Sequence, residues 1–230
     1  MKMMESIVLV GPKYGGNVGA VARCAKNFGL SDLVLAGSAP LGDEARKAAM
    51  HAQDVLAHAR IVGGLEEALG GMDYVVGTTS VRTISKGHYI RAAITPKELA
   101  HRLNGVDGRI ALLFGREDYG LSDEELERCD VVCRIPTAQG CPVMNLSHAA
   151  AIILYELHGL SETGIEMASV HEKDLMYERV GALLRAIKYH KHKTDNTLLM
   201  IKRLVGRAVL TEGEYHTLMG LLSRILSSVR

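Results

Sequence analysis

The sequence predicts an α/β protein with a parallel sheet, followed by a small all-α C-terminal extension. Two patterns lead to this prediction. Short apolar runs alternate with helical stretches up to about residue 162, and only helical periodicity follows. Alternating strands and helices are typical of a parallel sheet with right-handed crossovers. We therefore expect an α/β domain over residues 1–162 and a helical domain over residues 163–230.

The composition is that of an ordinary globular chain. Of 230 residues, 47% are apolar, and the net charge is +1, which excludes gross disorder. The charge is uneven, because the first domain holds 16 Lys and Arg against 19 Asp and Glu. The second domain holds 11 against 7, with four histidines, so the basic excess lies in the extension.

The strands are expected where short apolar runs meet turn residues. Arg109–Phe114 is a continuous apolar run, as expected of a parallel strand that is covered on both faces. Ser6–Val10 is an apolar run that stops at a Gly-Pro pair. The other strands are expected at Asp32–Ala36, Asp73–Thr78 and Val131–Ile135.

Capping signals place the helices between these strands. Asn17 is the expected N-cap of a helix that ends near Phe28. Ser122 and Glu125 form a capping box that opens a short acidic helix. Further helices are expected at Asp43–Ala57, Pro96–Leu103 and Asn145–His158. Apolar stripes predict a bundle of three more, at 176–187, 198–209 and 218–229, after a polar linker over residues 161–169.

The four cysteines match neither a zinc ribbon nor a redox motif. We expect reduced thiols and no metal, and a metal site built from Cys133, Cys141 and His148 is the alternative. No apolar run is long enough to span a membrane, and the N-terminus lacks the features of a signal peptide. These features predict a cytoplasmic protein with no membrane partner.

The first of three motifs covers Gly15–Arg23, at a strand-to-helix turn where exposed N–H groups can hold an anion. It lacks the Gly-x-Gly-x-x-Gly spacing of dinucleotide-binding proteins. We expect Arg23, six residues after Asn17, to lie on roughly the same helix face. The ordinary explanation is an arginine on a solvated surface helix.

The second motif, Leu113–Ser122, begins at the carboxyl end of an apolar strand, where open α/β sheets bind ligands. A turn before a capped helix explains its glycines but not Arg116 and Glu117. The third motif, residues 135–150, runs from a strand through a Pro/Gly loop into a helix. An ordinary N-cap accounts for Asn145.

Together and in this order, the motifs resemble the SpoU branch of the SPOUT RNA methyltransferases. The matching residues are Asn17, Gly19 and Arg23, then Phe114–Ser122, then Ile135–Ala149. The helical extension is similar to that of the TrmJ-type tRNA ribose methyltransferases.

This resemblance implies a C-terminal trefoil knot, a homodimer and S-adenosyl-L-methionine as cofactor. It also implies methylation of a ribose 2′-hydroxyl in tRNA, at nucleotide 32 of the anticodon loop. Alternatives are another tRNA or rRNA site, or a non-catalytic RNA-binding protein of the same fold. A Rossmann-type nucleotide enzyme is disfavoured by the missing glycine motif.

The resemblance also assigns roles to four polar residues. Arg23 would bind the target phosphate and orient the 2′-hydroxyl, because a guanidinium with a pKa above about 12 is a poor general base. Asn17 would position Arg23 or the ribose. Glu117 would hold the polar network, and Asn145 would bridge cofactor and substrate.

By position in the motifs, loop residues would hold the cofactor. These residues are Thr78, Thr79, Ser80, Leu113, Gly115, Arg116, Glu117, Ile135, Pro136, Val143, Met144, Leu146, Ser147 and Ala149. RNA binding would need cations, and two basic segments offer them: Arg82, Lys86 and Arg91 in a long acid-free connection, and Lys188, Lys191 and Lys193. The three lysines are expected at the end of the first C-terminal helix, where they also suit the helix dipole.

Overall fold

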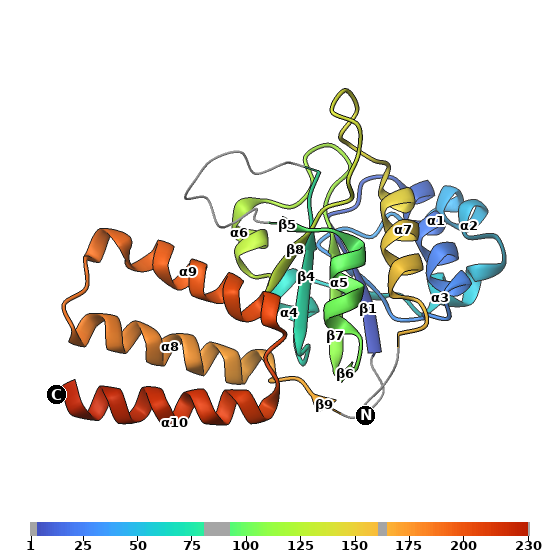
Figure 1. Cartoon of the computed structure of the whole chain (residues 1–230). Coiled ribbons are helices and arrows are strands. Elements are labelled where there is room, and N and C mark those ends of the chain that lie inside the picture. Colours follow the sequence, from blue (N-terminus) through green and yellow to red (C-terminus); the bar gives the residue numbers. More distant parts are fainter. Residues whose placement is uncertain (1–3, 81–92, 161–164, 230) are drawn as a thin grey trace.

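Parallel strands form the main sheet, in the order β3-β2-β1-β7-β4-β8-β5 (Figure 1). The structure, a computed structural model, describes residues 4–80, 93–160 and 165–229. The predicted parallel α/β sheet is confirmed. The strands of this sheet are β1 (Met4–Val10), β2 (Leu33–Ala36), β3 (Arg60–Val62), β4 (Tyr74–Thr78), β5 (Ala93–Ile94), β7 (Arg109–Phe114) and β8 (Val131–Cys133).

Helices cover both faces of the sheet. Successive strand residues point to opposite faces, so Ile7 and Leu9 of β1 join one apolar cluster and Val8 joins the other. The first cluster is covered by α1 (Gly15–Asn27), α2 (Asp43–Ala49), α3 (Gln53–Ala57), α5 (Pro96–Leu103) and α7 (Leu146–Leu157). The second is covered by α4 (Leu65–Ala68) and α6 (Asp123–Glu127).

Two expected features of the helices are wrong. Helix α1 begins at Gly15 with Tyr14 as its N-cap, so Asn17 lies inside the helix and its side chain is free for other contacts. The helix expected over 43–57 is broken into α2, a 3₁₀ turn (Met50–Ala52) and α3. Met50 has a φ of 48° there, and the Gln53 amide donates to the Met50 carbonyl at 3.1 Å.

Several short elements escaped the sequence analysis. Strand β3 lies at the sheet edge and exposes two of its three residues, so it has no apolar run to reveal it. Part of the expected linker forms β9 (Ile165–Glu166), which pairs in parallel with β6 (Val106–Asp107). The linker therefore ties the extension to the α/β domain. The expected trefoil knot stays a prediction.

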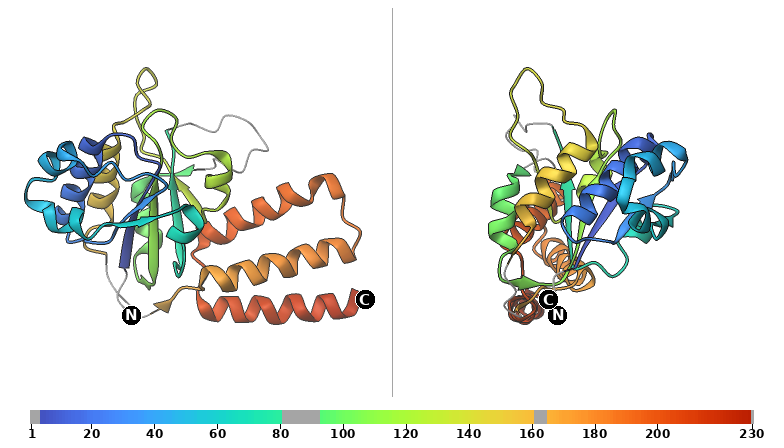
Figure 2. Two further views of the ribbon diagram at one scale, coloured as in Figure 1. Left: turned by 180° about the vertical axis from the view of Figure 1, so that it is seen from behind. Right: turned by 90° about the vertical axis from the view of Figure 1, so that its right-hand side faces the viewer.

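The extension consists of α8 (Val170–Ala186), α9 (Lys191–Ala208) and α10 (Glu212–Val229). Figures 1 and 2 show α8 between the other two, and α8 packs on both of them. The three expected helices are confirmed, but they form a layer with α8 in the middle. No helix in the described ranges is both long enough and apolar enough to cross a membrane.

Buried polar contacts dock this layer against the amino ends of β4 and β8. Lys173 of α8 forms an ion pair with Asp130 at 2.8 Å, and both side chains are about 5% exposed or less. Asp130 also accepts a hydrogen bond from the Val75 N–H at 2.8 Å. Arg203 of α9 is 1% exposed and donates to the Leu126 carbonyl at 2.8 Å. Breaking such buried pairs is strongly destabilising, so the extension is an integral part of the fold.

Gly206 of α9 allows the closest approach in this interface. A Cβ atom added there would lie 2.0 Å from the Asp130 carbonyl oxygen. The Gly206 carbonyl also accepts a hydrogen bond from the buried Tyr74 hydroxyl. Helix α9 can therefore rest directly on the backbone that leads into β8.

We predict that two glycine-to-alanine substitutions change the free energy of unfolding in opposite directions. Gly206→Ala should lower the free energy of unfolding by about 1–3 kcal/mol, because the new methyl group overpacks the interface. Gly220→Ala, in the exposed middle of α10, meets no atom within 4 Å and should raise it by about 0.5–1 kcal/mol. Urea denaturation of the full chain measures both. Equal effects of the two substitutions would contradict the docking described here.

Candidate active site

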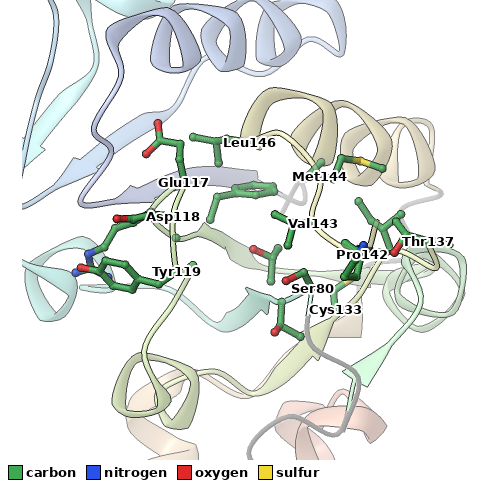
Figure 3. A pocket seen from close by; sticks show the side chains of 18 of the residues that line it. Ser80, Glu117, Asp118, Tyr119, Cys133, Thr137, Pro142, Val143, Met144 and Leu146 are labelled. Atoms are coloured by element: carbon green, nitrogen blue, oxygen red, sulfur yellow. Dashed lines mark hydrogen bonds between the residues drawn. The ribbon is translucent and has the colours of Figure 1, made fainter. Parts of the chain in front are cut away.

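A cavity of about 330 Å³ opens at the carboxyl ends of β4, β7 and β8 (Figure 3). Each strand contributes one of its last residues to the lining: Thr78, Phe114 and Cys133. Leu146 and Ile153 of α7 form the opposite side. This edge is where open α/β sheets bind their ligands, so the cavity is the candidate active site.

Most of the residues expected to hold a cofactor line this cavity. They are Thr78, Thr79, Ser80, Gly115, Arg116, Glu117, Ile135, Val143, Met144, Leu146 and Ala149. Leu113 is buried in the apolar cluster on the other face of the sheet, and its carbonyl accepts from the Thr78 hydroxyl at 2.9 Å. Ser147 donates its hydroxyl to Asn145 Oδ1 at 2.7 Å. Pro136 also lies outside the lining.

Further residues that were not expected also line the cavity. Two of them are Cys133 and Ile153, and periodicity could have predicted Ile153, which lies one turn of α7 after Ala149. Burial raises the pKa of Cys133 to about 12, so this thiol stays protonated and is no nucleophile. The other unexpected lining residues are Asp118, Tyr119, Gly120 and Thr137.

Three polar side chains, one from each sequence motif, form a continuous chain beside the cavity. The Asn145 amide donates to Asn17 Oδ1 at 3.0 Å, and the Asn17 amide donates to Glu117 Oε1 at 3.0 Å. Asn145 is also the N-cap of α7, as expected, because its Oδ1 accepts from the Ser147 N–H at 2.9 Å. Segments about 100 residues apart in the sequence therefore meet at one point.

The Glu117 carboxylate supplies acceptors to the first N–H groups near the start of α1. It accepts from the backbone N–H of Lys13 at 3.0 Å and of Tyr14 at 3.3 Å. Burial favours the neutral acid, but these bonds and the Asn17 amide outweigh it and hold the pKa of Glu117 below its usual range. Glu117 is therefore ionised at neutral pH and acts as a hydrogen-bond acceptor.

An ion pair fixes the loop that carries Glu117. Arg116 donates to both carboxylate oxygens of Glu125, at 2.9 and 3.0 Å. Glu125 belongs to the expected capping box of α6, where Ser122 Oγ accepts from its N–H at 3.2 Å. Arg116 therefore ties the cavity rim to a capped helix.

Arg23 lies apart from this cluster. Its side chain is exposed and is not part of the cavity lining. Six residues of α-helix turn a side chain by about 120° relative to the starting residue. The expectation that Asn17 and Arg23 share a helix face is therefore wrong. Gly19, between them, allows close packing instead, because a Cβ there would lie 2.0 Å from the Ala45 carbonyl oxygen of α2.

Of the two basic segments expected to bind RNA, the structure describes only the second. Arg82, Lys86 and Arg91 lie outside the described residues. Lys188, Lys191 and Lys193 are exposed at the turn from α8 to α9. Two of these lysines are in the first turn of α9, where a positive charge opposes the helix dipole. The expected placement at a helix C-terminus is wrong for these two.

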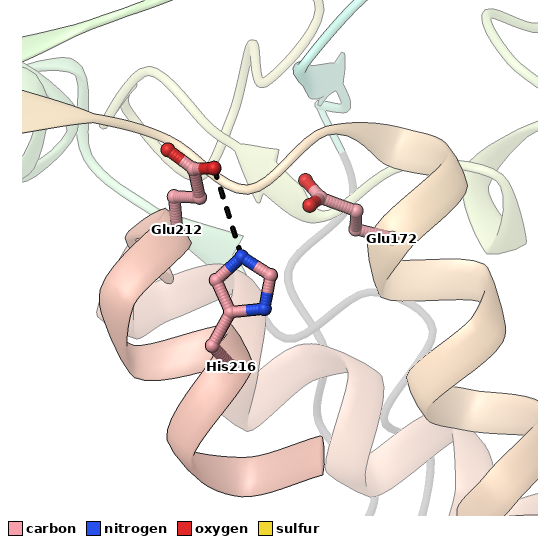
Figure 4. Close-up of side chains that lie close together, drawn as sticks. All are labelled: Glu172, Glu212 and His216. Atoms are coloured by element: carbon pink, nitrogen blue, oxygen red, sulfur yellow. Dashed lines mark ion pairs between the residues drawn. The ribbon is translucent and has the colours of Figure 1, made fainter. Parts of the chain in front are cut away.

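Among the described residues, one group of side chains could hold a metal ion, and it lies in the extension (Figure 4). Glu172, Glu212 and His216 bring ligand atoms within 4.8 Å of one another. Glu172 is already engaged in the capping box of α8, since it accepts from the Ser169 N–H at 2.9 Å. Helix N-termini also repel cations, so we assign the group to capping and an ion pair. The alternative site of Cys133, Cys141 and His148 is not formed.

We predict that Glu117→Gln destabilises the fold at pH 7 by about 1–2 kcal/mol, because an amide nitrogen would face N–H donors. A carboxyl with a depressed pKa stabilises the fold above its unfolded value of 4.5, and this contribution is lost as the pH falls through the folded value. The difference in free energy of unfolding between wild type and variant should therefore disappear at acidic pH. Urea denaturation at several pH values measures it, with the exposed Glu127→Gln as control. A gap that is independent of pH would contradict the assignment.

Comparisons with known proteins agree with this geometry. The chain is 38% identical to the tRNA (cytidine-2′-O-)-methyltransferase TrmJ of Methanocaldococcus jannaschii, over 95% of this chain and 98% of that protein. It is 32% identical to the tRNA (cytidine/uridine/adenosine-2′-O-)-methyltransferase TrmJ of Pseudomonas aeruginosa, over 94% of this chain and 91% of that protein.

Solved structures show the same architecture. The crystal structure of TrmJ from Z. mobilis ZM4 matches with a TM-score of 0.73 and 25% identity, over 96% of this chain and 99% of that chain. The SpoU methyltransferase AviRb from Streptomyces viridochromogenes, solved in complex with AdoMet, matches 68% of this chain and 60% of its own with a TM-score of 0.54 and 22% identity. The model of the SpoU rRNA methylase family matches residues 4–155. The chain therefore belongs to the SpoU methylase family.

Proposed function

We propose that the protein is a cytoplasmic enzyme that transfers a methyl group from S-adenosyl-L-methionine to a ribose 2′-hydroxyl in tRNA, at nucleotide 32 of the anticodon loop. The observation that carries this proposal is the meeting of Asn17, Glu117 and Asn145 at a cavity on the carboxyl edge of the sheet. The similarity to TrmJ methyltransferases over nearly the whole chain supports the class of substrate.

The cavity suits the cofactor by its size and by its mixed lining. Apolar side chains such as Phe114, Ile135 and Leu146 can flank an adenine ring, and the Gly115 backbone and the Ser80 side chain add polar groups to the lining. A largely apolar pocket of a few hundred Å³ with a few polar groups is typical for such ligands. S-adenosyl-L-methionine, when bound, supplies a methyl group on a sulfonium that needs no further activation.

The task left to the protein is to orient the sugar so that its 2′-oxygen faces the methyl group. Asn17 and Asn145 are held in one orientation by their mutual hydrogen bond and by Glu117. They offer a fixed polar edge toward a ribose, and alignment of this kind can supply several kcal/mol. Arg23, outside the cavity lining, would bind the phosphate next to the target sugar through its guanidinium group.

A homodimer would complete this arrangement. Helices α1 and α7 lie side by side, with the Phe28 ring 6.5 Å from that of Tyr155. Tyr155 is 69% exposed, and Arg23 extends from the same pair of helices. Exposed aromatic and basic side chains on these two helices suit contact with a second copy of the chain, whose own Arg23 would then face the RNA.

The three lysines at the α8–α9 turn would contact tRNA phosphates at a distance from the cavity. Their charges are exposed, and those in the first turn of α9 cost helix stability, which favours a role in binding. Phosphate contacts of this kind make binding depend on salt.

Calorimetry and a methylation assay test the proposed function together. In calorimetry, the protein should bind S-adenosyl-L-methionine and should not bind NAD. When tRNA is incubated with the protein and S-adenosyl-L-methionine, it should gain a 2′-O-methyl group at nucleotide 32. Resistance of the ribose linkage to alkaline cleavage maps the methylated position. Cofactor binding without methyl transfer would indicate a non-catalytic RNA-binding protein. Absence of cofactor binding would contradict the proposal entirely.

We predict that Arg23→Ala lowers the rate of methyl transfer by about 100-fold or more, because a misplaced target costs on that order. The affinity for S-adenosyl-L-methionine should stay at the wild-type value, since Arg23 is not in the cavity lining. The melting temperature should also be unchanged, because the Arg23 side chain is exposed. Single-turnover kinetics and calorimetry measure these quantities. A fully active variant would show that Arg23 has no role in methyl transfer.

A further inference from the structure

Tyr119 is an exposed aromatic side chain at the rim of the cavity (Figure 3). Its side chain is 64% exposed, whereas Phe114, the other aromatic residue of the lining, is 1% exposed. A single exposed aromatic residue is common on protein surfaces, so its surroundings decide whether it has a role.

The loop that carries Tyr119 is held in place. Arg116 and Gly120 exchange two backbone hydrogen bonds, at 3.2 and 2.8 Å, and close the loop between them. The Arg116 guanidinium carbon lies 5.2 Å from the centre of the Tyr119 ring and is itself fixed by Glu125. The ring is therefore positioned before any ligand arrives, which lowers the entropic cost of binding to it.

The cations around this ring already have acidic partners. Lys13 Nζ lies 6.0 Å from the ring centre and forms an ion pair with Asp118. Arg116 is paired with Glu125 at 2.9 Å. A phosphate would have to compete with both carboxylates, so the surface is a poor phosphate site. What it offers is a fixed aromatic ring, which suits an uncharged, flat ligand.

We propose that Tyr119 is a stacking platform for an RNA base next to the target ribose. This inference rests on the proposed function. Tyr119 lies two residues after Glu117, and Lys13 contacts the two residues before Tyr119, through its N–H to Glu117 and its side chain to Asp118. A base stacked on Tyr119 would therefore hold its neighbouring sugar close to the polar cluster. Stacking accepts any base, so the platform sets the position of the RNA and not its sequence.

The test measures the affinity of an anticodon stem-loop RNA across a salt series for wild type, Tyr119→Ala and Tyr119→Phe. Tyr119→Ala should weaken binding by about 5- to 150-fold, the range that loss of one stacked base represents. The slope of log Kd against log salt should not change, because no phosphate contact is lost. Tyr119→Phe should bind like wild type. Ile61→Ala, which removes a side chain that is 60% exposed on the edge strand β3, is the control and should have no effect.

A second variant tests the contact directly. The chain contains no Trp, so Tyr119→Trp introduces a single tryptophan reporter. Stacking predicts that RNA binding quenches its fluorescence and that affinity is retained. Unchanged fluorescence on saturation with RNA would overturn the proposal, as would wild-type RNA affinity of Tyr119→Ala.

Cofactor calorimetry separates this inference from the proposed function. Tyr119 lies at the rim of the cavity and is 64% exposed, so Tyr119→Ala should lower the affinity for S-adenosyl-L-methionine far less than the affinity for RNA. A loss of cofactor affinity with unchanged RNA affinity would show that Tyr119 contacts the cofactor and would contradict the proposal that it stacks on an RNA base. Failure of the wild-type protein itself to bind cofactor or to methylate tRNA would instead contradict the proposed function.

Discussion

The site depends on one carboxylate. Glu117 accepts hydrogen bonds from the backbone of Lys13 and Tyr14 and from the side chain of Asn17, so it joins the start of α1 to the loop after β7. The loop gains a fixed position, and the backbone that leads into α1 is held by the same carboxylate. Asn145 then adds α7 to the same cluster. Ionisation of Glu117 is what allows a single group to hold all of these donors.

The two ends of the sheet carry different tasks. The cavity lies at the carboxyl ends of β4, β7 and β8, whereas α8 and α9 are anchored at the amino ends through Lys173 and Arg203. The extension projects away from the sheet in both views that show it side-on (Figures 1 and 2). A change on the outer surface of the extension therefore lies far from the cavity and should not disturb it.

Local signals in the sequence predicted the strands well, because the central strands are continuous apolar runs and several helices carry capping boxes. The same reasoning failed where a distant group took over a local role. Asn17 looks like an N-cap, but α1 begins two residues earlier, and the Asn17 amide donates instead to Glu117, a hundred residues away. The edge strand β3 has no apolar pattern, and Met50 breaks a helix that has good periodicity.

For the candidate site, most of the residues that the family resemblance assigned to the cofactor do line the cavity. Leu113 does not, because alternation along β7 sends its side chain to the opposite face, whereas the side chain of the next residue, Phe114, lines the cavity. The exposed position of Tyr119 depends on how the loop closes, and spacing alone gives no sign of it.

A double-mutant cycle of Asn17→Ala and Glu117→Ala, read out as the rate of tRNA methylation, tests most directly whether the polar cluster acts as one unit. If it does, the double variant is no slower than the slower single variant, since groups that act together are strongly non-additive. Rate losses that simply multiply would show two independent residues and contradict the account.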